Sequence, residues 1–125
     1  MIETLILLFL LQIKHYYADF AMQTYSQTVR KGIYKDPVGI SHSLDHVLAS
    51  LIVLVIASFF IKMSLPCILL LSFIEGLVHY HIDWIKVRFG TKDMTKGLFW
   101  NQFGLDQLAH QLSYLIMVFI LLTYN

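Results

Sequence analysis

The sequence is poor in cysteine and in charged residues. Cys67 is the single cysteine among 125 residues, so an intrachain disulfide is excluded and no thiolate metal site is expected. Only 14% of the residues are charged, whereas 58% are hydrophobic and the mean hydropathy is +0.67. A soluble domain of this length needs more polar surface. The composition therefore predicts one integral membrane domain over residues 1–125, with the lipid bilayer as its surroundings and no nucleic-acid partner.

Four apolar stretches have the length of a transmembrane helix. They predict helices over about 2–29, 41–62, 65–88 and 101–124, the first of which is apolar to about residue 20 and more polar beyond it. Gly32, Pro37 and Gly39 in the first connection are turn or breaker residues. Ser64 and Pro66 predict that a new helix begins after a very short second connection. The expected fold is all-α, an up-down-up-down four-helix bundle in the membrane.

Basic residues are distributed unevenly between the connections. Only Lys62 falls in the second connection. The first and third connections, with the helix ends beside them, carry the other eight: Lys14, Arg30, Lys31, Lys35, Lys86, Arg88, Lys92 and Lys96. The positive-inside rule then places the first and third connections in the cytoplasm and both termini outside.

Nine ionisable residues interrupt the apolar stretches at four-residue spacing, which stacks their side chains on one helix face. They are His15 and Asp19; His42 and His46; Glu75, His79 and Asp83; and Asp106 and His110. A charge at the bilayer centre costs roughly 2.5 to 3.5 kcal/mol even on the mildest scale, so these groups require an offsetting interaction. In helices of alternating direction these positions share one level. His15, His46, His79 and His110 are each expected roughly 18 to 25 Å from the outer end, in the cytoplasmic half of the membrane.

Five imidazoles and four carboxylates at one depth predict a site for one or two divalent metal ions, either zinc, manganese or iron. The predicted ligands are His15, Asp19, His42, His46, His79, Asp83, Asp106 and His110. Glu75 is expected to be a further ligand or the acceptor that orients His79, and Lys86 to steady a substrate anion. A metal-free proton or ion pathway and a purely structural polar network are the alternatives.

Other polar residues near these helices are assigned to different roles. Asp45 either joins His42 and His46 or faces the lipid headgroups, and the sequence does not decide between the two. His81 points about 200° away from His79 on a helix and is expected at the membrane interface. Lys14, Lys86 and Arg88 lie at the membrane boundary, where basic residues ordinarily determine topology. This role is favoured over the alternative, in which they bind an anionic substrate near the metal ions.

The polar motifs follow a specific order over nearly the whole chain. They are His15-x-x-x-Asp19-Phe20-x-x-Gln23, His42-x-x-x-His46, Glu75-x-x-x-His79-x-x-Ile82-Asp83-x-x-Lys86 and Asp106-Gln107-x-x-His110. Together they resemble the domain-of-unknown-function 3307 family of small bacterial and phage membrane proteins. The resemblance implies a bacterial or phage inner-membrane origin and brings no established activity. A looser similarity to membrane-bound metal-dependent hydrolases is an analogy only.

The leading functional hypothesis is a membrane-embedded metal-dependent enzyme, a hydrolase of a phosphoester or other ester at the cytoplasmic leaflet of the bacterial inner membrane. Its substrate would be lipid-linked or a small anionic molecule. The alternatives are a di-iron oxidase, a cation or proton transporter, and a noncatalytic phage accessory protein with a structural metal site. Transport is disfavoured because outer helix segments such as Leu5 to Leu11 have almost no polar side chains that could line a path.

Overall fold

The computed structural model describes residues 1–123, and all the regular elements in this part of the chain are helices, with no strand. The elements are α1 (Ile2–Tyr16), the π-helical turn η1 (Tyr17–Ala21), the short α2 (Tyr25–Arg30), α3 (Pro37–Ala57), α4 (Leu65–Phe89) and α5 (Gly97–Thr123). The all-α fold class is therefore confirmed.

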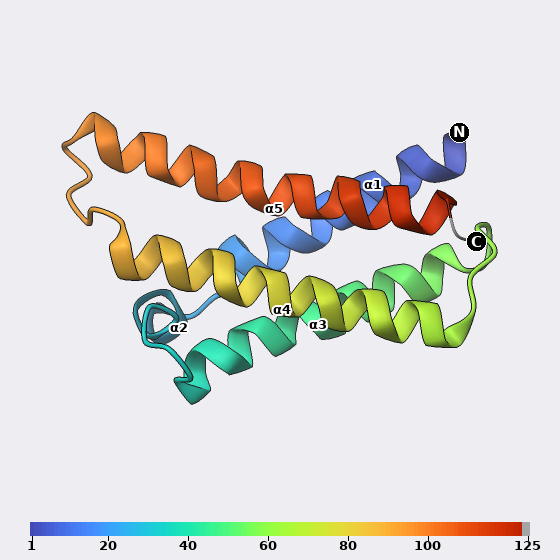
Figure 1. Ribbon diagram of the computed structural model, residues 1–125, viewed down its shortest axis with the longest axis horizontal. Helices are drawn as coiled ribbons and strands as arrows, with labels where there is room; N and C mark the ends of the chain where they lie inside the picture. Colours follow the sequence, from blue (N-terminus) through green and yellow to red (C-terminus); the bar gives the residue numbers. More distant parts are fainter. Residues whose placement is uncertain (124–125) are drawn as a thin grey trace.

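The four long helices lie alongside one another and alternate in direction (Figure 1). Helix α3 contacts α1 and α4, and α5 contacts α4 and α1, so the four helices enclose a common interior. The N-terminus lies at the same end as the α3–α4 connection, whereas α2 and the α4–α5 connection lie at the opposite end (Figure 1). Sites halfway along the helices therefore receive side chains from all four.

The first helix differs from its prediction over 2–29. The α-helix ends at Tyr16, continues as the π-helical turn η1, and is interrupted at residues 22–24 before α2. Thr24 starts α2 anew, because its hydroxyl accepts a hydrogen bond from the Gln27 backbone N–H while the Gln27 side chain accepts one from the Thr24 backbone. The polar extension is thus a separate element that can turn back toward the other helices.

The later helix boundaries differ less. Helix α3 begins at Pro37 rather than 41, because the Asp36 carboxylate accepts a hydrogen bond from the Val38 N–H at 2.8 Å and proline fits the first turn. Pro37, which was expected to break a helix, therefore starts one. Ser64 caps α4 and Pro66 occupies its first turn, as predicted. Helix α5 begins at Gly97, and its predicted end at Tyr124 lies outside the described residues.

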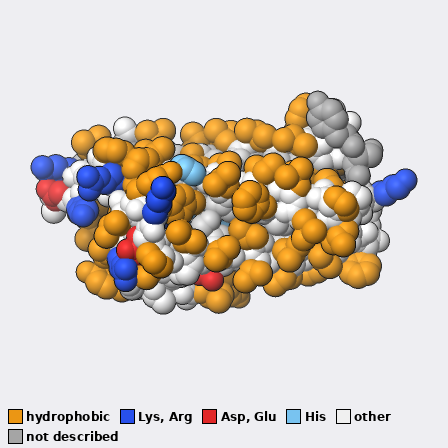
Figure 2. All heavy atoms as spheres, turned by 60° about the horizontal axis from the view of Figure 1, so that its bottom comes forward, with side chains coloured by type: hydrophobic (Ala, Val, Ile, Leu, Met, Phe, Trp, Pro, Cys, Tyr) orange, Lys and Arg blue, Asp and Glu red, His pale blue; other side chains and the backbone are white. Residues whose placement is uncertain are grey.

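Three of the described helices, α3, α4 and α5, are long and apolar enough to cross a membrane. Helix α1 has 15 residues and is not one of them, so the first of the four predicted spans is not supported. Figure 2 shows hydrophobic side chains along most of the visible face, with Lys and Arg gathered toward one end. Such a surface is compatible with a lipid environment.

The interior has an apolar half and a polar half. The apolar half contains Leu7 and Leu11 of α1, the last turns of α3, the first turns of α4 and the last turns of α5: Val53, Leu54, Ala57, Ile68, Leu71, Tyr114, Met117, Val118 and Leu121. It occupies the end of the molecule that carries the α3–α4 connection. The buried ionisable residues lie farther along the same helices, toward α2.

Candidate metal centre

All eight predicted metal ligands meet in the polar half of the interior. They come from every long helix and from η1: His15, Asp19, His42, His46, His79, Asp83, Asp106 and His110. Their side chains are between 0% and 6% exposed. The structure therefore brings together residues separated by as much as 95 positions in the chain, in an interior where a bare charge is costly.

Asp19 is the centre of the first ligand group. Its Oδ1 atom lies 3.0 Å from His42 Nε2, 3.0 Å from His46 Nε2 and 3.4 Å from His79 Nε2. A carboxylate oxygen has two lone pairs, so it cannot accept three good hydrogen bonds from these rings. Ligands around one tetrahedral ion at 2.0 to 2.1 Å stand about 3.3 Å apart, which is close to the observed spacing. The arrangement of these four side chains therefore fits the ligands of a bound cation better than it fits a cluster of hydrogen bonds.

Asp83 faces this group and a second one. Its Oδ2 atom lies 3.2 Å from His79 Nε2 and 3.3 Å from His42 Nε2, and its Oδ1 atom lies 3.7 Å from His110 Nε2. Asp106 Oδ1 is also 3.7 Å from His110 Nε2. Asp83, Asp106 and His110 offer ligand atoms within 4.8 Å of one another, as do His15, His79 and His110. Asp83 is thus the carboxylate that lies between the two groups of candidate ligands.

Several buried polar atoms of these groups have no hydrogen-bond partner within residues 1–123. They include both ring nitrogens of His79 and His110, Asp83 Oδ2 and Asp106 Oδ1, in addition to His42 Nδ1 and Ser72 Oγ. Buried nitrogen and oxygen atoms are paired in the large majority of cases, so each exception calls for an explanation. Most of them lie where imidazoles and carboxylates converge, which is the arrangement expected of residues that could hold a metal ion.

The imidazole rings are stacked on one another. The ring centroids of His46 and His79 are 3.4 Å apart, and those of His79 and His110 are 4.1 Å apart. Positive charges on adjacent rings at these distances would repel strongly in a buried site. The neutral form of imidazole is the one that binds metals.

Two buried lysines pair with the acidic residues of the centre. Lys14 Nζ lies 2.8 Å from Glu75 Oε1, and Lys31 Nζ lies 2.9 Å from Asp83 Oδ1. Four carboxylates, with side chains at most 6% exposed, face two ammonium groups and leave two negative charges, which one divalent cation would balance with neutral histidines.

Sequence reasoning missed both of these lysines as partners of the site, because it treated them as topology determinants. The position of Lys14 next to His15 in an apolar helix could have indicated that it belongs to the site. No feature of the sequence indicates the same for Lys31. Lys31 reaches the centre because α2 folds back against α3, where a Cβ on Gly39 would meet Lys31 Cα at 3.0 Å.

Glu75 lies outside the ligand groups of the centre. Its Oε1 atom is 3.8 Å from both His46 Nδ1 and His79 Nδ1, which is too long for a hydrogen bond. It accepts instead from Lys14 and, through Oε2, from the Ser50 hydroxyl at 2.9 Å. The structure therefore places it behind the imidazoles, as a counter-charge to Lys14.

Two further groups that support His15 were not assigned from the sequence. The Tyr114 hydroxyl lies 3.0 Å from His15 Nδ1, and Gln107 Oε1 lies 3.1 Å from His15 Nε2. The opposite ring, His42, has Gln23 Nε2 at 2.8 Å from its own Nε2. These contacts hold the orientation of two rings at the edge of the centre.

Three polar residues considered from the sequence are not part of the cluster. Lys86 Nζ lies over the Phe103 ring, 5.4 Å from its centroid. Asp45 is exposed and accepts a hydrogen bond from Gln27. The His81 Nδ1–H donates to the Leu77 carbonyl at 2.8 Å. Asp45 and His81 are consequently suitable control positions.

Comparison with curated proteins and with solved structures gives no match. The sequence model of one protein family, described as "Protein of unknown function (DUF3307)", matches residues 6–125, which is nearly the whole chain and includes every residue of the metal centre. This chain therefore belongs to the DUF3307 family.

Proposed function

We propose that the protein is a membrane-embedded metal-dependent hydrolase, acting on a phosphoester or other ester at the cytoplasmic leaflet. The observation that carries the proposal is the convergence of imidazoles and carboxylates from the four long helices and η1 into adjacent groups of ligands, in which several nitrogens and oxygens on α3, α4 and α5 are unpartnered. Helical bundles are frequent hosts of such sites.

The ligand groups divide the centre into two ion positions. Asp19, His42, His46 and His79 would hold one ion, and Asp83, Asp106 and His110 the other, with His15 at their edge. Mixed imidazole and carboxylate ligands suit zinc, manganese or iron. A divalent ion held there would supply hydroxide at neutral pH, because it lowers the pKa of the water it binds.

The protein groups around the ligands have separate tasks in this scheme. Lys14 and Lys31 neutralise Glu75 and Asp83. The site therefore has two surplus positive charges once two divalent ions are bound with four carboxylates ionised and two lysines protonated, before hydroxide and substrate are counted. That excess attracts an anionic substrate. Lys86, outside the cluster, provides a further positive charge near Asp106.

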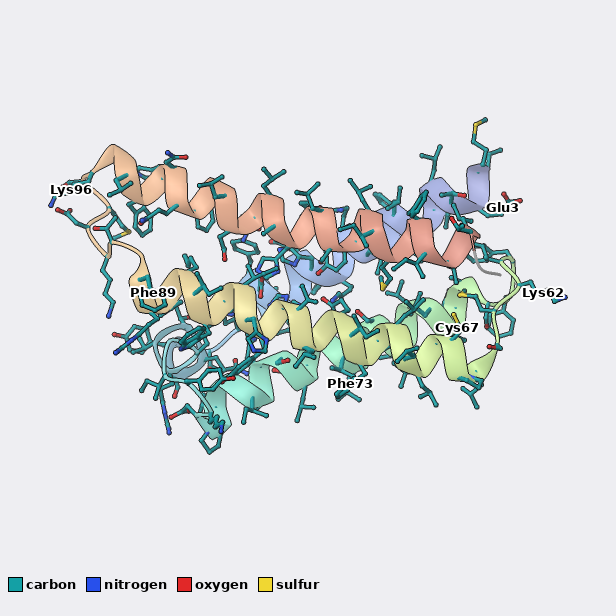
Figure 3. All side chains as sticks on the ribbon, viewed as in Figure 1. Glu3, Lys62, Cys67, Phe73, Phe89 and Lys96 are labelled. Atoms are coloured by element: carbon teal, nitrogen blue, oxygen red, sulfur yellow. The ribbon has the colours of Figure 1, made fainter. Side chains whose placement is uncertain are left out.

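The membrane placement belongs to the same proposal. Helices α3, α4 and α5 are taken as spans, with α1 and η1 completing the bundle. Most basic residues lie toward the end that carries α2 and the α4–α5 connection, and Figure 3 shows Lys62 at the other end from Lys96. The positive-inside rule then puts the metal centre toward the cytoplasm of a bacterial inner membrane, with both termini outside.

Transport has less support than hydrolysis. The interior beyond the metal centre is filled by Leu7, Leu11, Leu54 and other apolar side chains of the core. An ion leaving the centre in that direction would meet no polar group to replace its ligands. A di-iron oxidase would use the same ligands, and optical spectra of the purified protein separate iron from zinc.

The proposal is tested by measuring whether the purified protein in liposomes hydrolyses lipids that contain a phosphoester or a carboxylic ester. We expect a chelator to abolish activity and zinc or manganese to restore it. His79→Ala should be inactive with its helix content intact, while His81→Ala, two residues away but outside the cluster, should keep the wild-type rate. Full activity after chelation, or in His79→Ala, would reject the proposal.

A further inference from the structure

A cavity of about 310 Å³ lies between α4 and α5, beside the metal centre. Its volume is at the lower end of the range for small-molecule sites. The Asp106 side chain, a candidate metal ligand, forms part of its wall, and Lys86 and Gln102 are its other polar side chains. Most of the remaining wall is apolar and includes Ile82 and Ala109. The cavity therefore joins a ligand of the centre to a cation.

Lys86 differs from the two buried lysines of the centre. Lys14 and Lys31 each lie within 2.9 Å of a carboxylate oxygen. Within residues 1–123, by contrast, no carboxylate stands within 4.0 Å of the Lys86 ammonium, which is only half-buried and faces the Phe103 ring. An ammonium without a counter-charge at the edge of an apolar cavity attracts an anion.

The cavity borders the apolar outer surface of the molecule. Three of its lining residues, Ile85, Phe89 and Leu105, are 53%, 68% and 58% exposed. Phe89 ends α4 next to the α4–α5 connection (Figure 3). In a bilayer these side chains would contact lipid, so a molecule dissolved in the membrane could enter sideways between α4 and α5 without crossing water.

We propose that this cavity binds an anionic single-chain amphiphile, with its charged head at Lys86 and its chain along the apolar wall. The head would then lie in a cavity that Asp106, a candidate metal ligand, also lines, so an ester bond beside the head would be near the site of the proposed hydrolysis. The substrate class thus rests on the proposed function, whereas binding of the amphiphile requires only the cavity and Lys86.

The experiment uses the full-length protein in dodecyl maltoside micelles. The probe is dodecyl phosphate with a photoreactive diazirine in its chain, and labelled peptides are mapped after irradiation. We expect labelling of α4 and α5 around Ile82 and Ala109. Unlabelled dodecyl phosphate should compete, whereas inorganic phosphate and a cationic amphiphile of equal chain length should not.

Variants of two lysines give the matched comparison. Lys86→Ala should weaken labelling about tenfold, because one charge-assisted contact is lost. Lys86→Arg should retain it, and Lys62→Ala, at the opposite end of the molecule (Figure 3), should bind as the wild type does. Ala109→Phe fills the cavity and should block labelling by steric exclusion.

The metal content of every sample separates this inference from the proposed hydrolase. Equal labelling of wild type and Lys86→Ala, or competition by inorganic phosphate, would overturn the amphiphile site whatever the metal content. Lysine-dependent labelling of a protein that binds no metal would support the amphiphile site and contradict the hydrolase.

Discussion

The two halves of the interior are built from the same four helices but differ in how their side chains interact. In the apolar half, Leu7, Leu54 and Leu121 belong to one cluster of buried side chains, and apolar contacts of this kind have no preferred direction. In the polar half, each side chain meets its neighbours through particular atoms, as Asp19 Oδ1 meets three Nε2 atoms. The apolar half is complete as it stands, whereas the polar half leaves ring nitrogens and carboxylate oxygens unpaired.

This difference indicates which half determines stability and which determines function. Close packing stabilises the bundle wherever apolar side chains fit together, including in lipid, where helix association depends on packing. Buried charges contribute little net stability even when they are well paired. The proposed metal binding therefore explains the polar half better than a contribution to folding does.

The largest expected effect comes from Asp83→Ala. This change removes the carboxylate that faces both ligand groups and leaves the Lys31 ammonium buried without a partner. We expect loss of bound metal and a fall of about 3 to 5 kcal/mol in the free energy of unfolding. Elemental analysis and unfolding in detergent measure the two effects. Asp45→Ala is the control and should keep both values, so an Asp83 variant indistinguishable from it would contradict the assignment.

The next largest loss of stability is expected from removing one partner of the buried ion pair Lys14–Glu75. Lys14→Met should cost about 3 kcal/mol of unfolding free energy, because it leaves Glu75 charged without its counter-ion. The double variant Lys14→Met/Glu75→Gln should recover most of that loss, since no bare charge remains. A double-mutant cycle of the four proteins measures the coupling, and additive losses would mean that the pair is not formed.

In the apolar half, Leu54→Ala should lower the free energy of unfolding by about 2 to 4 kcal/mol through the cavity it leaves. Metal stoichiometry should not change, which is the opposite pattern to that of a ligand variant. Leu69→Ala, at a position 51% exposed, is the matched control and should have a much smaller effect. Metal loss in Leu54→Ala would show that metal binding in the polar half depends on packing in the apolar half.

The smallest expected effect is that of Gly76→Ala. A Cβ at this position would collide with the Val47 side chain and meet the Ser43 carbonyl at 3.2 Å, where α3 and α4 approach closely. We expect a loss of about 1 to 3 kcal/mol of unfolding free energy and weaker metal binding, because His79 follows one turn later. Gly104→Ala, with nothing within 4 Å of the added Cβ, should be neutral or slightly stabilising. Equal stability of the two variants would rule out the close approach.

The sequence predicted the parts of this architecture that depend on periodicity. Apolar stretches of helix length and polar residues four apart gave the directions of the four long helices and the faces that turn inward. The convergence of His15, His46, His79 and His110 at one depth followed from the alternating directions alone. Ser64 and Pro66 marked the start of α4 correctly because capping is a local property.

Other features depend on contacts that no local pattern encodes. The π-helical turn that carries Asp19 and the return of α2 toward α3 arise from packing against other helices, so the first helix was predicted too long. Lys31 reaches Asp83 only because that return takes place. Lys86 shares the helix stripe of Asp83 but lies on a cavity wall outside the cluster, because the stripe extends beyond the ligand groups. Periodicity identifies a face of a helix, and tertiary packing decides which residues on it meet.

The proposed metal centre is tested most directly by elemental analysis of the protein purified without added metal and again after loading and desalting. It predicts one or two divalent ions, zinc, manganese or iron, per chain, and their loss in Asp19→Ala and His110→Ala but not in His81→Ala. A wild-type protein that retains no ion in either preparation would contradict it.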